Sequence, residues 1–171
     1  INDDIENNLT ASILLKYFSK DTNTVYPPYL EFKWDDSTYS STLTELSTDI
    51  ATIGIKNAKE KYNDSDSVRF RLSVRPKYPT RTFTTSSIYL TEFKLPTASY
   101  WGVKDEKTGE MVIDFDTSFT KLSADNTSNY FDVTMNSFHP ERYYRLLVKT
   151  TVNDSTIVID NKNIFKVTKH G

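Results

Sequence analysis

Short segments in which apolar and polar residues alternate recur along the chain, and this period of two limits the possible folds more than any other feature. In residues 68–75 (VRFRLSVR), an apolar residue occupies every second position, with arginine or serine between. Successive side chains of a β-strand point to opposite faces, so such a segment predicts a strand with one buried and one solvated face. The same period is found in residues 30–34, 111–115, 131–135 and 144–148.

The residue types agree with strands that are joined by polar turns. Thr, Tyr and Phe favour strands, whereas the abundant Asn, Ser and Asp favour turns. Turns separate the expected strands at intervals of about 8 to 12 residues, which is typical of antiparallel sandwiches. The 171 residues are enough to bury a core without disulfides, and the chain has no cysteine. The sequence therefore predicts an all-β protein built of antiparallel β-sandwiches.

Two linked sandwich units are predicted, residues 1–85 and residues 86–171. The Thr-rich segment 81–93 is expected to pass from one unit to the other, with Leu95-Pro96 as the joint. Within the units, residues 57–67 are predicted to be a charged connection and residues 161–163 a turn.

The stretch YFSKDTNTVYPPYLEFKWDD, residues 17–36, is interpreted as a seam between rigid units. Its first strand would close a sandwich upstream, and its prolines, which cannot donate to a ladder, would cross the joint. Leu30, Phe32 and Trp34 would then begin the next core. Because the chain begins with Ile1 and not Met, we expect it to be processed or, as we favour, part of a longer polypeptide.

The segment FHPERYYRLLV, residues 138–148, resembles the corner before strand F of immunoglobulin-like and fibronectin type III domains. In those domains a buried tyrosine returns its hydroxyl to the backbone upstream. Tyr144 is the better candidate for that role, because it shares a strand face with Leu146 and Val148. The resemblance implies an immunoglobulin- or fibronectin III-like fold for residues 86–171 and says nothing about function.

No catalytic constellation is evident in the sequence. The chain has two histidines, His139 and His170, which are too few for a histidine cluster that binds a transition metal. It also has no Gly-x-Ser-x-Gly motif that would present a nucleophilic serine. We expect both histidines to be ordinary surface residues.

Three carboxylate pairs are candidates for acid–base catalysis or for a weak Ca²⁺ site. They are Asp35 with Asp36, Asp64 with Asp66, and Asp114 with Asp116. None belongs to an Asp-x-Asp-x-Asp-Gly loop, and each suits a solvated turn or strand face better. We therefore predict that the protein is not an enzyme and that it has no catalytic, cofactor-binding or metal-binding residues.

A basic row is interleaved with aromatic residues in the segment 69–83, as in proteins that bind single-stranded nucleic acid. It consists of Arg69, Arg71, Arg75, Lys77 and Arg81. In a strand, however, the arginines and Phe70 point to opposite faces. The whole chain is also nearly balanced, with 21 basic and 23 acidic residues, so we predict no nucleic-acid partner. No apolar run approaches the roughly 20 residues that cross a bilayer, so membrane insertion is not expected either.

Four aromatic residues are predicted to be exposed. They are Tyr29, Tyr39, Tyr100 and Trp101. Exposed aromatic rings stack on sugar rings in carbohydrate-binding modules, and Tyr and Trp are equally favoured in protein interfaces. The sequence leaves both alternatives open.

Taken together, residues 17–36, RPKYPTRTFTTSS at residues 75–87 and residues 138–148 resemble virion structural proteins of tailed bacteriophages, particularly T4-like phages of marine and cyanobacterial hosts. The resemblance covers most of the chain and includes no catalytic signature. It implies a non-enzymatic structural component of the virion, in a fibre, collar, neck, tail or capsid decoration, without a cofactor. The implied partners are other virion proteins and further copies of the chain. The alternative is a host-surface adhesin or carbohydrate-binding module whose partner is a host surface glycan.

Overall fold

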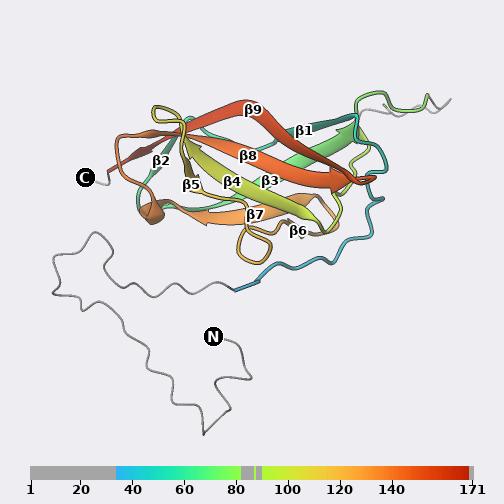
Figure 1. The fold of residues 1–171 in the computed structure, drawn as a ribbon, viewed down its shortest axis with the longest axis horizontal. Coiled ribbons are helices and arrows are strands. Elements are labelled where there is room, and N and C mark those ends of the chain that lie inside the picture. The colour runs from blue at the N-terminus through green and yellow to red at the C-terminus, as the bar shows by residue number, and fades with distance from the viewer. Residues whose placement is uncertain (1–33, 82–86, 88–89, 170–171) are drawn as a thin grey trace, which may run out of the picture. The chain divides into compact units, whose positions relative to one another are not determined.

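The computed structural model describes residues 34–81, 87 and 90–169 of the chain. These residues form two β-sheets that pack face to face, which confirms the predicted all-β sandwich (Figure 1). The predicted seam lies outside the described residues except for its last three positions, 34–36. Tyr29, His170 and most of the expected crossing at residues 81–93 also lie outside the described residues.

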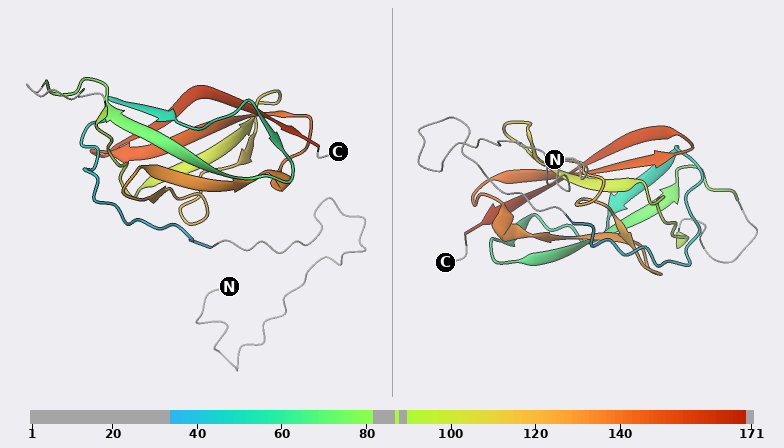
Figure 2. Two further views of the ribbon diagram at one scale, coloured as in Figure 1. Left: turned by 180° about the vertical axis from the view of Figure 1, so that it is seen from behind. Right: turned by 60° about the horizontal axis from the view of Figure 1, so that its bottom comes forward.

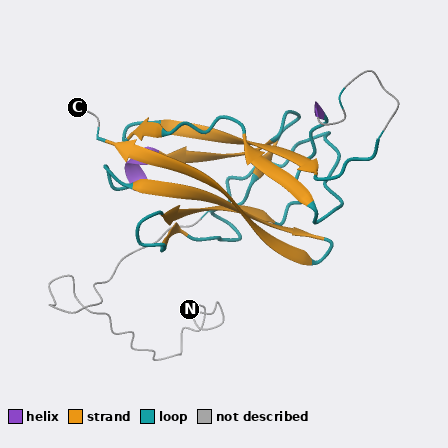
Figure 3. Ribbon diagram, turned by 90° about the horizontal axis from the view of Figure 1, so that it is seen from above, coloured by secondary structure: helices purple, strands orange, loops and turns teal. Residues whose placement is uncertain are grey.

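Two layers of strands are visible when the sandwich is seen from above (Figure 3). The first sheet has the order β1 (Ala51–Ile55), β3 (Ser67–Pro76), β7 (Asn129–Thr134) and β6 (Ser123–Ala124). The second has the order β2 (Lys61–Asn63), β9 (Ser155–Thr168), β8 (Tyr143–Val152), β4 (Ser99–Asp105) and β5 (Met111–Ile113). Neighbouring strands are antiparallel except β2 and β9, which are parallel. A 3-10 turn, η2 (Met135–Ser137), follows β7.

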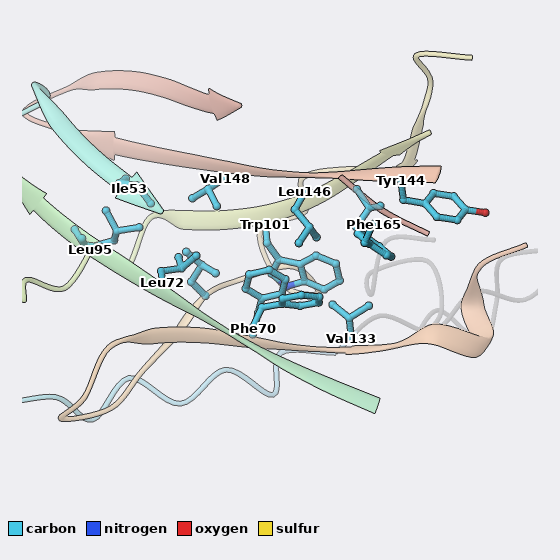
Figure 4. Close-up of a cluster of buried hydrophobic side chains, with 14 of the residues drawn as sticks. Ile53, Phe70, Leu72, Leu95, Trp101, Val133, Tyr144, Leu146, Val148 and Phe165 are labelled. Atoms are coloured by element: carbon cyan, nitrogen blue, oxygen red, sulfur yellow. The ribbon is translucent and has the colours of Figure 1, made fainter. Parts of the chain in front are cut away.

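The core lies between the sheets and follows the period of two. Phe70, Leu72 and Val74 of β3 are fully buried, and Tyr144, Leu146 and Val148 of β8 approach the core from the opposite sheet (Figure 4). Aromatic rings connect the two layers. The ring of Phe131 stacks on Phe70 with centroids 5.3 Å apart and on Trp101 with centroids 5.0 Å apart. Because buried aromatic rings remove large apolar areas from water, this stack is a main source of stability.

The predicted division into units 1–85 and 86–171 is wrong for the described residues. β3 forms a ladder with β7, in which Phe70 lies opposite Phe131, so strands from both predicted units share one sheet. Leu95, at the predicted joint, is fully buried in the common core. All described residues belong to one unit, residues 33–171. The alternation shows which face of a strand is buried, but it does not show which strands pair.

Two shorter predictions are also wrong. The connection predicted at residues 57–67 contains β2, a three-residue strand that pairs in parallel with the end of β9. The turn predicted at residues 161–163 is an irregularity inside the continuous strand β9, where the register with β8 shifts between Leu146 and Val148. Lys162 has a φ of 55° there, so the polar residues bend the strand without ending it.

The tyrosine contact predicted before β8 is present. Tyr144 is buried, and its hydroxyl donates a hydrogen bond to the carbonyl oxygen of His139. His139 itself is exposed, as expected for a turn residue.

The two long sides of the sandwich are closed differently. On the side of β1 and β9, the side-chain amide of Asn161 donates to the carbonyl oxygen of Ile53 and links the sheets. On the other side, residues 120–122 bond to β4 and residues 123–124 bond to β7, so the chain crosses there from one sheet to the other. Figure 2 shows the sandwich from two further directions. β6 covers β7 only at Asn129 and Tyr130. Among the described residues, no strand pairs with the remaining edge of β7, from Phe131 to Thr134.

Candidate functional site

A groove of about 500 Å³ lies along this uncovered edge of β7. We call it the β7 groove and define it by Trp34, Asp36, Phe119, Lys121, Asp132 and Thr134. These residues come from three distant parts of the sequence, and the crossing at residues 120–124 brings them together. The side chains of Trp101, Phe131 and Val133, which belong to the core, form its floor.

Two aromatic side chains stand exposed in the β7 groove. Trp34 is 59% exposed, and its ring meets that of Phe119 edge to face with centroids 6.2 Å apart. Phe119 is positioned by the turn before it, in which the carboxylate of Asp116 accepts hydrogen bonds from the backbone N–H groups of Ser118 (2.8 Å) and Phe119 (3.0 Å). The acidic residue thus shapes a turn that holds an apolar ring at the surface.

The walls of the β7 groove carry charges that are already paired. Arg69 binds Asp132 through two hydrogen bonds of 2.8 and 2.9 Å, and its guanidinium lies over the ring of Tyr130. On the facing wall, Lys121 Nζ lies 3.1 Å from the carboxylate of Asp35. Hydrogen bonds from Ser37, followed by the one from Lys121, lower the pKa of Asp35. The β7 groove therefore combines exposed aromatic rings with charged side chains that are mostly paired with one another, so it has little net charge.

A second hollow, of about 570 Å³, lies where β8 begins. We call it the corner patch and define it by Asp105, Glu106, Glu141, Arg142, Tyr143 and Ile164. Tyr143 is 54% exposed, and Ile164 is exposed beside it. Asp105 is the buried member: its carboxylate accepts from the N–H groups of Thr108 and Lys107, and these bonds together with Arg142 lower its pKa.

The ion pairs around the corner patch hold its rim in place. Arg145 bridges two carboxylates: it donates two hydrogen bonds to Glu106, that from Nε being 2.6 Å long, and one of 2.9 Å to Asp160. The bonds to Glu106, followed by the one to Asp160, raise the pKa of its guanidinium, which stays charged in any case. Lys166 of β9 pairs with Glu141, which lies in the turn before β8. The patch thus has an apolar centre and a charged, internally paired rim.

Each predicted carboxylate pair has at least one member that is engaged by other groups of the chain. Asp35 faces Lys121 while Asp36 lies in the β7 groove. Asp66 accepts from the N–H of Asn63, and Asp114 accepts from the N–H of Phe115, as in polar turns. Within the described ranges, no group of three or more His, Cys, Asp or Glu side chains is arranged to hold a metal ion.

Two arginines of the predicted basic row, Arg69 and Arg71, are paired with carboxylates of the same chain. Arg69 binds Asp132, and Arg71 binds Asp125 through bonds of 3.2 and 2.9 Å. The Arg71 guanidinium is the main reason that the pKa of Asp125 lies well below its usual range. Phe70 points to the opposite side and is buried, as the alternation predicts. These arginines therefore neutralise acidic residues on the outer face of the first sheet.

The predicted set of exposed aromatic residues needs correction. Trp101 is only 5% exposed and belongs to the core. Tyr39 is half-buried, its hydroxyl donates to the carbonyl oxygen of Leu95, and burial raises its pKa to about 12. Tyr100 is half-buried as well.

The aromatic residues that are exposed at the β7 groove were not identified by the sequence patterns. Trp34 belongs to an alternating segment and was therefore expected in the core, which is wrong, and Phe119 belongs to no alternating segment. The usable signal for Phe119 is the Asp-Thr-Ser turn before it, which ends with the ring at the surface. For Trp101, the signal is its alternation with Ser99 and Val103, both of which are buried.

No protein-family model matches the chain, and no curated protein sequence matches it. In the part of the chain that is described, no helix has the length and apolar character required to cross a membrane.

Proposed function

We propose that the protein is a non-enzymatic structural component of a tailed-phage virion, which acts by assembling with other virion proteins and with copies of itself. The sequence resemblance at residues 17–36, 75–87 and 138–148 supports the phage assignment. The structural observation that carries the assembly role is the corner patch, with an apolar centre inside a charged rim. Protein interfaces are commonly built this way, with Tyr and Arg enriched in them.

We further propose that the sandwich is immunoglobulin-like, and the strand order supports this assignment. Immunoglobulin domains have strands A, B, E and D in one sheet, and strands C, F and G in the other. If β3 is strand B, then β1, β3, β7 and β6 take the order A-B-E-D, and β9, β8 and β4 take the order G-F-C. Trp101 is then the buried tryptophan of strand C, and Tyr144 the corner tyrosine of strand F. The unit would begin at β1 and not at residue 86.

The geometry of the corner patch suits a protein partner. Tyr143 and Ile164 lie on the neighbouring strands β8 and β9, where Ile164 is opposite Arg145. A tyrosine ring has few rotatable bonds, so it contributes contact area at a low cost in conformational entropy. The surrounding charges already have partners in the same chain, so docking would not have to neutralise them.

The proposal is tested on purified phage particles. Mass spectrometry of intact particles should detect the protein, and sedimentation of the isolated chain should show self-association. Ile164→Asp places a carboxylate in a patch that already contains Asp105, Glu106 and Glu141, so we expect it to reduce incorporation into particles strongly. Val158→Asp is the matched control, because Val158 is also exposed on β9 (55%) and does not line the patch.

Two results would contradict the proposal. One is a protein that is absent from intact particles and remains monomeric in solution. The other is equal incorporation of Ile164→Asp and Val158→Asp into particles, which would show that the corner patch has no role in assembly.

A further inference from the structure

The residues that directly follow Trp34 fix its position at the surface. Asp35 pairs with Lys121, and the backbone of residues 38–40 is fixed on Ala124 by two hydrogen bonds of 2.8 and 2.9 Å. The ring itself remains largely exposed and touches only the edge of Phe119 among the described aromatic rings. Such an anchored aromatic ring can bind a ligand without first losing much conformational freedom.

Several polar groups of the groove are left without a protein partner. The carboxylate of Asp36 and the hydroxyl groups of Thr38, Thr134 and Ser137 all line the groove, and none makes a side-chain hydrogen bond within the described part of the chain. By contrast, the cations of Arg69 and Lys121 are each paired with a carboxylate. The free groups are therefore hydrogen-bonding oxygens beside an apolar ring, in surroundings of little net charge.

We propose that the β7 groove is a saccharide-binding site, which takes one or two sugar rings of a surface oligosaccharide. A sugar ring has an apolar C–H face that stacks on an aromatic ring and hydroxyl groups that both donate and accept hydrogen bonds. Trp34 would supply the stacking surface, and Asp36 would accept from sugar hydroxyls. The volume of about 500 Å³ is within the usual range for small-ligand sites. This assignment does not depend on the corner patch.

The competing occupant is a polypeptide strand that pairs with the edge of β7, as exposed edges allow. That edge is short, because β6 covers the strand as far as Tyr130 and the chain turns into η2 at Met135. A strand bound at Phe131 to Thr134 would gain few main-chain hydrogen bonds. It would also not require the free carboxylate of Asp36 or the free hydroxyl groups of Thr38 and Ser137, which lie outside that edge, so a saccharide is favoured.

The test uses the full chain on an array of bacterial surface oligosaccharides, made of O-antigen and capsular repeat units, with calorimetry on the glycans that bind. Trp34→Ala should weaken binding about tenfold or more, because the stacking surface is lost. Asp36→Asn should weaken it severalfold while leaving the apolar surface intact. Tyr78→Ala is the control, because Tyr78 is 76% exposed and does not line the groove, and it should bind as the wild type does.

Thermal unfolding of each variant checks the fold independently, and we expect little change because all three side chains are exposed. Three results would overturn the proposal. The wild-type chain could bind no oligosaccharide on the array. Trp34→Ala and Asp36→Asn could bind as tightly as Tyr78→Ala. Alternatively, the wild type could form a dimer that Trp34→Ala dissociates, which would make the groove a strand-pairing interface between copies.

Discussion

The hydroxyl of Tyr144 donates a hydrogen bond of 3.0 Å to the carbonyl oxygen of His139, five residues upstream. The bond closes the corner that leads into β8, while the ring packs in the core against Phe138 and Phe165. Burial raises the pKa of Tyr144 above its ordinary value of about 10, so its hydroxyl stays protonated and able to donate into alkaline pH. One side chain thus joins a surface turn to the interior.

Replacing Tyr144 with Phe isolates this hydrogen bond, because the ring is retained. We expect the free energy of unfolding to fall by about 1 kcal/mol, the usual net contribution of one hydrogen bond. Chemical denaturation measures the change. Tyr143→Phe is the matched control, since the neighbouring ring is exposed and its hydroxyl makes no hydrogen bond within the described residues, and it should leave stability unchanged. Equal effects of the two substitutions would contradict a specific role for the corner bond.

Asn129 is a fully buried amide that satisfies two backbone groups of other segments. Its oxygen accepts from the N–H of Leu95 at 2.7 Å, and its NH₂ donates to the carbonyl oxygen of Ser123 at 3.3 Å. Asn129→Ala leaves both groups buried and unpaired, which should cost about 3 kcal/mol. Asn136→Ala, at an exposed position, should change the free energy of unfolding by less than about 0.5 kcal/mol. A similarly small effect of Asn129→Ala would mean that water replaces the amide.

Replacement by alanine is expected to have opposite effects on stability at Gly102 and at Gly54. A Cβ at Gly102 would lie 2.9 Å from the end of the Met111 side chain, 3.0 Å from the ring of Phe115 and 3.2 Å from a backbone oxygen. Gly102→Ala should therefore destabilise the fold by about 1 to 2 kcal/mol through overpacking.

A Cβ at Gly54 would meet nothing within 4 Å. Gly54→Ala should consequently be neutral or stabilising by up to about 1 kcal/mol, because alanine loses less backbone entropy on folding than glycine does. Thermal denaturation of the two variants measures the difference. If Gly54→Ala proves the more damaging, the packing of Met111 and Phe115 against Gly102 is not as described.

The pair of Arg71 and Asp125 should make stability depend on acid pH. The folded protein lowers the pKa of Asp125, so this stabilising contribution is fully present above the unfolded value of about 3.9 and is lost as the pH falls through the lower folded value. Asp125→Asn keeps the side-chain acceptor of the turn but removes the charge. We expect the difference in melting temperature between wild type and Asp125→Asn to be constant above about pH 4 and to shrink progressively as the pH falls below that value. A difference that stays constant down to pH 2 would contradict the assignment.

Much of the local structure could be predicted from the sequence, because burial on one face leaves a period of two. The alternation in β3 and β7 identifies Phe70, Leu72 and Phe131 as core residues, and the segment before β8 identifies the role of Tyr144. These features depend on neighbouring residues, which is why they are visible without a structure.

The pairing of β3 with β7 and the composition of the β7 groove could not be predicted in this way. Val68 and Val133 lie opposite each other in the ladder, but nothing in either segment identifies the other as its partner. In the groove, Trp34 and Phe119 meet because residues 38–40 are hydrogen-bonded to Ala124, in the crossing segment that follows Phe119. The exposure of Trp34 is equally non-local, since alternation alone places it in a core.

The parallel pairing of β2 with β9 gives the domain a point of shear resistance to tension along the chain. Once the contacts of residues 35–55 are released, a pull on residues 34 and 169 reaches β2 at Lys61 and β9 at Thr168, which are opposite ends of this short ladder because the strands run in the same direction. The force is then a shear, shared by the ladder and by the added bonds of the Thr168 side chain to Tyr62 and Asn63. These bonds must break together instead of opening one by one, so the smallest strand becomes a mechanical clamp.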